Sequence, residues 1–182
     1  VSRAQNIKNG TDIIILLKTG LRRSELLALR WENVDMEKKI IHVRESVSET
    51  GGGLEIHPCK STKSIRDIPF DDELYDIFSK MQRSGFVIKG QNGKNINPHN
   101  WSYKRYAVAN KKIQEVAEMA GMSLPLLNPH EMRHTFGSIL YERGVDIVTI
   151  SKLMGHSSIE ITVKLYVHDS LEKKMEAIQK LS

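Results

Sequence analysis

Clusters of isoleucine and leucine stand out near the start of the chain. They fill residues 12–18 and 24–29 at helix-compatible spacing, and Thr19-Gly20 interrupts them. Apolar residues at this spacing are typical of helices that bury one face, and glycine readily ends a helix. The pattern therefore predicts two short helices joined by a tight turn.

The apolar pattern then changes to short segments that are rich in isoleucine and valine. These segments cover residues 40–47, 54–59 and 66–70, and a glycine run at residues 51–53 separates the first two. Short segments of β-branched residues bounded by turns are typical of strands. We therefore expect one small antiparallel sheet of three strands.

Helix-start signals follow the last of these strands. Asp71 is placed to cap a helix that runs to about residue 83. Asn97 and Asn128 each precede a proline, which is the order expected at a helix start because proline is tolerated at the first helical position. These signals predict that the second half of the chain is mainly helical.

Two further helices and an amphipathic tail complete the predicted fold. Asp146 is expected to begin a short helix, and Ser157 has capping-box spacing to Glu160 for a helix over residues 159–167. Residues 171–182 form an amphipathic tail that either packs on a neighbouring protomer or folds back on its own domain. The whole pattern predicts an α+β fold, with one mostly helical domain over residues 1–182 and a small three-stranded antiparallel sheet.

The composition is that of a folded globular protein with a moderate excess of positive charge. Apolar residues make up 40% of the 182 residues, and 27 Lys and Arg against 22 Asp and Glu leave a net charge of +5. This charge permits a polyanionic partner without requiring one. Cys59 is the only cysteine, which excludes a disulfide framework, and the longest apolar run, residues 13–17, is too short to span a bilayer. Because the chain begins with Val1, we expect a C-terminal fragment of a longer protein.

One short motif suggests a zinc protease. Residues 130–134 match H-E-x-x-H, so that His130 and His134 would share a helix face and Glu131 would serve as general base. The third histidine position of the longer metzincin pattern holds leucine, although Glu160 remains open as a third ligand. Arg133 on the same face would place a fixed positive charge beside the metal. The motif is therefore kept only as a minor alternative.

A different set of residues appears when the glutamate of this motif is left aside. Arg22 lies just after the predicted turn, and His130 and Arg133 are one helical turn apart. His156 follows later in the chain, and Tyr166 lies ten residues after it. Arginines can clamp the non-bridging oxygens of a phosphate, a histidine can move a proton, and a tyrosine can attack as a covalent nucleophile. These residues are what metal-free phosphoryl transfer needs.

The segments that carry these residues resemble those of the tyrosine recombinases, the phage-integrase family. The matching segments are TGLRRSELLALRW (19–31), KSTKSIRDIPF (60–70), HEMRHTFGSILYERG (130–144) and LMGHSSIEITVKLYVH (153–168). The resemblance covers essentially the whole chain as the catalytic domain of such an enzyme, and it implies the fold of that domain. It also implies a DNA strand transfer through a 3′-phosphotyrosyl intermediate, without metal or nucleotide cofactor.

The resemblance assigns a role to each matching position. It implies that Arg22 and Arg133 are the catalytic arginines, with Glu25 supporting the first. Lys60 is implied as the catalytic lysine, with Lys63 as the competing choice because the hairpin length varies in this family. The remaining implied catalytic residues are His130, His156 and the nucleophile Tyr166.

The implied partner is double-stranded DNA at a specific recombination site. The resemblance also implies a homotetramer acting on two DNA sites. We expect the protein in the host bacterial cytoplasm, at the nucleoid and not at a membrane. Arg23, Lys63, Lys104 and Arg105 are candidate DNA contacts, although Lys104 and Arg105 suit a solvated helix face equally well. A type IB topoisomerase with the same chemistry, which would relax DNA, remains an alternative to a recombinase.

Overall fold

The computed structural model of the chain describes residues 6–59, 61–90, 93–166, 175 and 179. Lys60 and almost all of the predicted tail at residues 171–182 lie outside the described residues. Most of the described residues in regular elements are helical, and the strands form small antiparallel sheets. The predicted α+β class is therefore confirmed.

The first two predicted helices and their turn are present. They are α1 (Gly10–Thr19) and α2 (Arg23–Ala28), and Gly20 ends α1 in the left-handed conformation with φ of +60°. A Cβ atom at Gly20 would lie 2.4 Å from the ring of Phe136, so this turn also allows α6 to approach closely. Glycine is needed here for both its conformation and its size.

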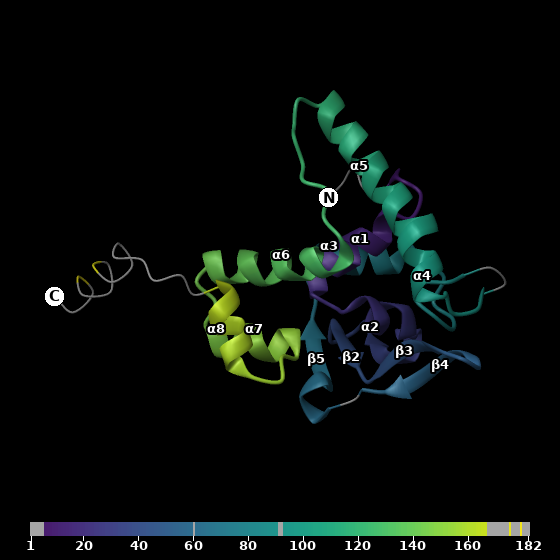
Figure 1. Ribbon diagram of the computed structural model, residues 1–182, viewed down its shortest axis with the longest axis horizontal. Helices are drawn as coiled ribbons and strands as arrows, with labels where there is room; N and C mark the ends of the chain where they lie inside the picture. Colours follow the sequence, from purple (N-terminus) through teal and green to yellow (C-terminus); the bar gives the residue numbers. More distant parts are fainter. Residues whose placement is uncertain (1–5, 60, 91–92, 167–174, 176–178, 180–182) are drawn as a thin grey trace.

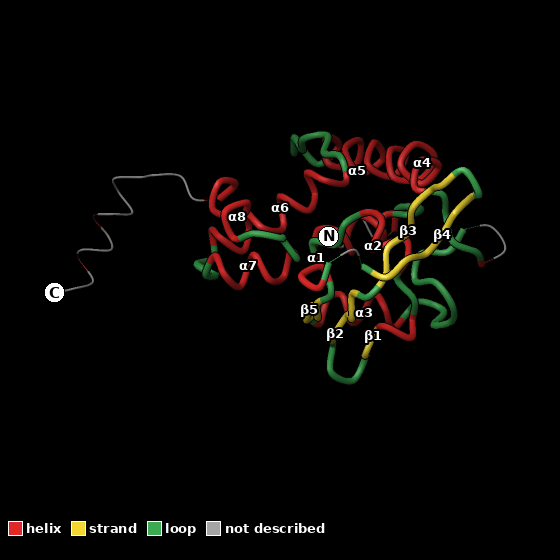
Figure 2. Tube along the Cα trace, turned by 60° about the horizontal axis from the view of Figure 1, so that its bottom comes forward, coloured by secondary structure: helices red, strands yellow, loops and turns green. Residues whose placement is uncertain are grey.

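The strands form two sheets, and the prediction of a single three-stranded sheet is wrong in this respect (Figure 2). One sheet has the order β1-β2-β5, and the other is the hairpin of β3 and β4. The strands are β1 (Val34–Asp35), β2 (Ile40–Val43), β3 (Glu45–Thr50), β4 (Gly53–Pro58) and β5 (Arg66–Pro69). The predicted strand at 40–47 is divided at Arg44, whose side chain donates hydrogen bonds to Arg66 O and Asp67. The chain leaves the first sheet at that residue, so β4 pairs with β3 alone.

The helices of the second half begin close to where the sequence signals place them. They are α3 (Asp72–Ser79), α4 (Pro98–Asn100), the π-helical segment η5 (Trp101–Tyr106), α5 (Ala107–Met119), α6 (Pro129–Glu142), α7 (Ile147–Met154) and α8 (Ile159–Tyr166). The side chains of Asp71, Asn97, Asn128 and Asp146 all accept cap hydrogen bonds. At α8 it is Ser158, and not Ser157, whose hydroxyl accepts a hydrogen bond from a first-turn amide, that of Glu160.

The apolar interior is divided into a large and a small cluster. The large one is built around α1 and α2 and includes Ile15, Leu26 and Trp101, all fully buried. Figure 1 shows α6 crossing the molecule, with α5 rising at one end and α7 and α8 lying below the other. The small cluster, Phe136, Ile150, Met154 and Tyr166, joins α6, α7 and α8. The predicted nucleophile is thus a core residue of the smaller cluster.

No helix in the described part of the chain is long and apolar enough to cross a membrane.

Candidate active site

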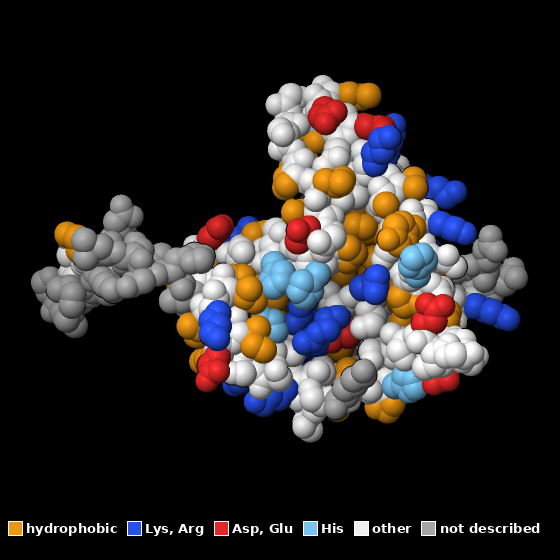
Figure 3. Space-filling model, in the orientation of Figure 1, with side chains coloured by type: hydrophobic (Ala, Val, Ile, Leu, Met, Phe, Trp, Pro, Cys, Tyr) orange, Lys and Arg blue, Asp and Glu red, His pale blue; other side chains and the backbone are white. Residues whose placement is uncertain are grey.

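A hollow between the start of α2 and the start of α6 contains three of the predicted catalytic residues, Arg22, His130 and Arg133. The other residues that line it are Arg23, Ser24, Ser102, Tyr103, Asn128 and Pro129. Figure 3 shows histidine and Lys or Arg side chains gathered at the centre of this face of the molecule. The N-terminus of α6, a helix of 14 residues, adds partial positive charge to the same place. The hollow is therefore suited to an anion.

Arg22 is held in place by its own helix and by a distant loop. Glu25, three residues on, accepts hydrogen bonds from the Arg22 backbone N–H at 2.8 Å and from Nη1 at 2.7 Å. Nη2 donates to Gly155 O at 2.7 Å, which ties the start of α2 to the end of α7. The guanidinium is therefore fixed before any ligand arrives, as preorganised charge stabilisation requires.

Glu25 lies between Arg22 and a second arginine, Arg66, that the sequence analysis did not single out. Arg66 donates from Nη1 and Nη2 to the two Glu25 oxygens at 3.0 and 2.8 Å, and from Nε to Leu153 O at 2.6 Å. Burial favours a raised pKa for Glu25, but the hydrogen bonds and charge of Arg66, with those of Arg22, lower it to about 2. Glu25 is therefore ionised at neutral pH and holds two guanidinium groups at fixed positions.

A sequence signal for Arg66 existed in the alternation of its strand. β5 alternates buried and exposed residues, and Arg66 occupies an inward position like Ile68. A charged residue at an inward strand position needs a buried partner, because an unpaired buried charge is costly. The alternation would have identified Arg66 as a residue paired in the interior.

Arg133 is almost completely buried, with 1% of its surface exposed. Nη1 donates to Gly20 O at 2.5 Å, and Nη2 donates to Met154 O. Burial first, and then the charge of Arg22, lowers the pKa of Arg133 to about 9, so that the side chain stays positively charged at neutral pH. Arg22 and Arg133 both bind carbonyls of the segment at residues 154–155, which places His156 beside them.

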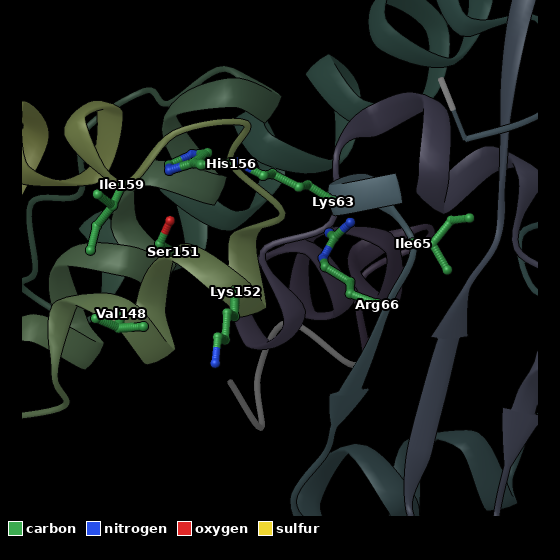
Figure 4. Close-up of a pocket in the computed structure, with 8 residues that line it drawn as sticks. All are labelled: Lys63, Ile65, Arg66, Val148, Ser151, Lys152, His156 and Ile159. Carbon is green, nitrogen blue, oxygen red and sulfur yellow. The ribbon is translucent and has the colours of Figure 1, made fainter. Parts of the chain in front are cut away.

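His156 lines a second hollow, together with Lys63, Arg66 and Lys152 (Figure 4). Its Nδ1 atom lies 2.7 Å from Thr162 Oγ1. Burial and then the charges of Arg133 and Arg22 lower the pKa of His156 to about 4, so its ring is neutral at pH 7. Lys63 extends to the same loop and donates from Nζ to Ser157 O at 2.6 Å.

Tyr166 has its hydroxyl directed into the small apolar cluster, and only 5% of its surface is exposed. The hydroxyl lies 3.3 Å from Met154 Sδ and 3.4 Å from both Nδ1 and the carbonyl oxygen of His134. Gly137 makes room for it, because a Cβ atom there would lie 2.3 Å from the hydroxyl. Burial raises the pKa of Tyr166, and the charge of Arg133 offsets part of that rise.

His134 lies between Tyr166 and His130. The ring centroids of His130 and His134 are 4.4 Å apart in an edge-to-face arrangement, and His134 Nδ1 lies 3.4 Å from the tyrosine hydroxyl. Burial, and then the positive charges that His130 and Arg133 can carry, lowers the pKa of His134. The structure thus gives His134 a contact to the predicted nucleophile.

The glutamate of the H-E-x-x-H motif has a structural role in α6. Glu131 Oε2 accepts a hydrogen bond from the Asn128 backbone N–H at 2.6 Å, and Asn128 Oδ1 accepts from the Glu131 N–H at 3.0 Å. This reciprocal pair is a capping box. Within the described ranges, no group of three or more His, Cys, Asp or Glu side chains is placed to hold a metal ion.

The four candidate DNA contacts differ in their surroundings. Arg23 is exposed and donates to Ser102 Oγ at 2.8 Å at the edge of the first hollow, and Lys104 is exposed on η5. Arg105 instead turns inward, where it donates to Asp12 Oδ1 at 3.0 Å and to Lys89 O at 2.7 Å. Arg105 lies on the π-helical segment η5 and is only partly exposed, so its role as a DNA contact stays a prediction.

The sequence pattern of the family described as "Phage integrase family" matches residues 2–173. The chain is 28% identical to the tyrosine recombinase XerC-like of Caldanaerobacter subterraneus subsp. tengcongensis, over 93% of this chain and 48% of that protein. It is 27% identical to the transposase from transposon Tn916 of Enterococcus faecalis, over 96% of this chain and 46% of that protein. The chain spans about half the length of these curated relatives.

A solved structure with a similar fold is that of the Tn1549 transposon integrase in complex with circular intermediate DNA. It matches with a TM-score of 0.81 and 29% sequence identity, over 96% of this chain and 60% of that chain. The family match covers nearly the whole sequence, and the similar structure carries the same arrangement of helices and small sheets. This chain therefore belongs to the phage integrase family, the tyrosine recombinases.

Proposed function

We propose that this chain is the catalytic domain of a site-specific DNA recombinase that cleaves and rejoins DNA through Tyr166. The observation that carries the proposal is the convergence of Arg22, His130 and Arg133 on one hollow, next to the loop of His156. Two guanidinium groups held by protein carbonyls can bind the non-bridging oxygens of a phosphodiester without rearranging. The names of the relatives and the DNA in the Tn1549 integrase complex support DNA as the substrate.

In the proposed cleavage step, the Tyr166 oxygen forms a bond to phosphorus and the bond from phosphorus to the 5′ oxygen breaks. The tyrosine proton passes to His130, and Lys60 protonates the leaving 5′ oxygen to give a free 5′-hydroxyl. The product is a 3′-phosphotyrosyl ester. A 5′-hydroxyl of another strand can attack this ester by the reverse steps, so rejoining needs no nucleotide cofactor.

The charges around the phosphate are supplied by protein groups in this proposal. Arg22 and Arg133 neutralise the non-bridging oxygens, and His156 donates a hydrogen bond to one of them. Arg66 and Glu25 do not touch the phosphate but fix the position of Arg22. We expect no metal requirement, because the arginines provide the positive charge that a metal ion provides in other phosphoryl-transfer sites.

Tyr166 has to change its surroundings for this chemistry. Its hydroxyl lies among Met154, His134 and Gly137, away from the hollow where Arg22 and His130 meet. The hydroxyl contacts are long, at 3.3–3.4 Å, so they hold it weakly. We propose that DNA binding draws the end of α8 out of the small cluster and brings the Tyr166 oxygen to the phosphate.

The proposed partner is duplex DNA at a specific recombination site, bound by a homotetramer in the host cytoplasm. We propose that Arg23 at the edge of the hollow and the exposed Lys104 contact the DNA backbone. Phosphate contacts of this kind make affinity fall steeply with salt. The assembly, the site and the location rest on family membership.

The decisive experiment is the trapping of a covalent protein–DNA adduct. The chain is incubated in EDTA with nicked duplexes that carry the ends of its own genetic element, and the products are separated in denaturant. A covalent adduct in the unchanged protein and none in Tyr166→Phe would support the proposal, whereas an equal adduct in Tyr166→Phe would refute the assignment of the nucleophile. An adduct that requires added metal would refute the metal-free mechanism.

Two companion assays separate the alternatives that share this chemistry. Exchange of strands between two DNA sites identifies a recombinase, whereas relaxation of supercoiled DNA without exchange identifies a topoisomerase. For the lysine, Lys60→Ala and Lys63→Ala are compared on DNA whose 5′ bridging oxygen is replaced by sulfur. A thiolate leaves without protonation, so this substrate restores cleavage only in the variant that lacks the general acid, which we expect to be Lys60→Ala.

A further inference from the structure

His156 and Thr162 form a partly buried hydrogen bond next to the proposed phosphate site. The two residues are six positions apart, and His156 Nδ1 lies 2.7 Å from Thr162 Oγ1. Thr162 is fully buried, with 0% of its surface exposed. It lies on α8 one turn before Tyr166, and these are the two buried residues of that helix. The contact therefore joins the helix of the proposed nucleophile to the histidine loop.

The buried hydroxyl of Thr162 has to donate in this bond. Hydroxyls on other helices give their proton to the carbonyl four residues earlier, as Thr19 does to Ile15 O and Thr135 to Glu131 O. Across the described residues, the hydrogen-bond partner of Thr162 Oγ1 is His156 Nδ1. If Nδ1 carried a proton, the Thr162 proton would be buried without an acceptor, which proteins strongly avoid.

We infer that Thr162 is a positioning residue that donates its hydroxyl proton to His156 Nδ1 and thereby keeps the ring proton on Nε2. This inference rests on the proposed function for its consequence, which is that Nε2–H is available to donate to a non-bridging oxygen of the phosphate. A neutral imidazole has one N–H, so the partner of one nitrogen decides what the other can do.

The surroundings of His156 give this tautomer its importance. The ring is neutral at pH 7, because burial and the nearby Arg133 and Arg22 lower its pKa to about 4. A protonated ring would donate from both nitrogens, and no tautomer would need to be selected. Lys63 holds the next residue through Ser157 O, and Figure 4 shows Lys63 and His156 extending towards each other at the same hollow. Lys63 thus fixes the position of the loop, and Thr162 determines which nitrogen of the His156 ring carries the proton.

The first test measures the tautomer directly in the DNA-free chain. The 182-residue protein is labelled with ¹⁵N-histidine, and long-range ¹H–¹⁵N correlation spectra are recorded at pH 7, with His156→Gln used to assign the signals. We expect an unprotonated, pyridine-like shift for Nδ1 and a protonated shift for Nε2. A protonated Nδ1 in the unchanged protein would overturn the inference, and this measurement needs neither a Thr162 variant nor DNA.

The second test compares Thr162→Val with Thr162→Ser. Valine keeps the shape and removes the donor, so we expect a mixture of both His156 tautomers. We also expect a loss of about tenfold in the rate of adduct formation, the lower end of the loss seen when partners that orient metal-binding histidines are removed. Serine keeps the donor, so it should retain the Nε2–H tautomer and most of the rate. Equal tautomer and equal rate in Thr162→Val would overturn the inference.

The two tests also separate this inference from the proposed function. Absence of any adduct in the unchanged protein, together with the expected tautomer, would count against the recombinase activity and leave the Thr162 bond established. If Thr162→Val does not fold, the His156 tautomer in the unchanged protein and in Thr162→Ser decides the inference. Absence of the Nε2–H form in either protein overturns it.

Discussion

Arg66 and Glu25 are 41 residues apart in the sequence and form a two-point ion pair whose side chains are almost fully buried. The same carboxylate binds Arg22, and the same guanidinium binds Leu153 O. One ion pair thus joins β5, α2 and the end of α7 at the proposed phosphate site. It gives the site its rigidity, and it makes part of the stability of the fold depend on pH.

Acid should destabilise the chain partly through Glu25. Its pKa is lowered from 4.5 to about 2 in the folded state, so the stabilisation is complete above pH 4.5 and is lost as the pH falls towards 2. The expected loss is about 3 kcal/mol in the free energy of unfolding, from the size of this shift. Urea unfolding at pH 7, 5, 3 and 2 measures it, with about 2 kcal/mol of the loss expected by pH 3.

Glu25→Gln is the control for this pH dependence. It should be less stable at pH 7, because Arg66 is left as a buried charge without its partner, and it should lose less stability between pH 5 and 3. A variant whose stability falls as steeply as that of the unchanged protein over this range would show that Glu25 is not responsible.

Gly137→Ala should displace Tyr166 from the small cluster. The added Cβ atom would lie 2.3 Å from the tyrosine hydroxyl and 2.8 Å from Met154 Sδ, so both groups have to move. We expect a loss of about 1–3 kcal/mol in the free energy of unfolding, as for other overpacked sites. We also expect Tyr166 to be iodinated faster, which mass spectrometry measures. Gly51→Ala, where no atom lies within 4 Å, is the matched control. Unchanged iodination in Gly137→Ala would contradict the packing described here.

Lys104→Ala and Arg105→Ala should affect different properties, although the residues are adjacent. Lys104 is exposed, so its removal should reduce the slope of log DNA affinity against log salt concentration by about one. Arg105 pairs with the buried Asp12, so its removal should cost about 3 kcal/mol in stability and leave that slope unchanged. Fluorescence anisotropy across a salt series and urea unfolding measure the two effects. A reduced salt slope in Arg105→Ala would show that this side chain turns outward on DNA.

Glu131→Gln should leave the adduct reaction intact. Glutamine can replace glutamate in a capping box, so the change in stability is expected to stay within about 1 kcal/mol. The general base of a zinc protease would not tolerate this substitution. Adduct formation by Glu131→Gln at the rate of the unchanged protein supports the capping role, whereas a loss of more than about a hundredfold would assign Glu131 to the chemistry.

Local chemistry made several features predictable from the sequence. The caps at Asp71, Asn97, Asn128 and Asp146 were found because a side chain that binds an amide two or three residues on acts within one turn. The same holds for Gly20, since a left-handed residue after a helix depends on that residue alone. The family membership was predictable because its motifs combine several such short segments in a fixed order.

Features that depend on contacts between distant segments were not predictable in this way. Arg44, at which the predicted strand at 40–47 is divided, binds Arg66 O and Asp67, and Arg105 binds Asp12, which is 93 positions away in the sequence. Periodicity describes the faces of a segment but does not say which distant segment covers each face.

The sequence by itself thus determined where the helices begin, and it supplied the residues that we propose for phosphoryl transfer. Only the tertiary structure decided that Arg22 binds Gly155 O, that Arg133 binds Gly20 O, and that the Tyr166 hydroxyl is packed inside the small cluster. The first two bonds join residues 133 and 113 positions apart. Such contacts form only when packing of the apolar faces has brought the segments together, because no local preference acts over that distance.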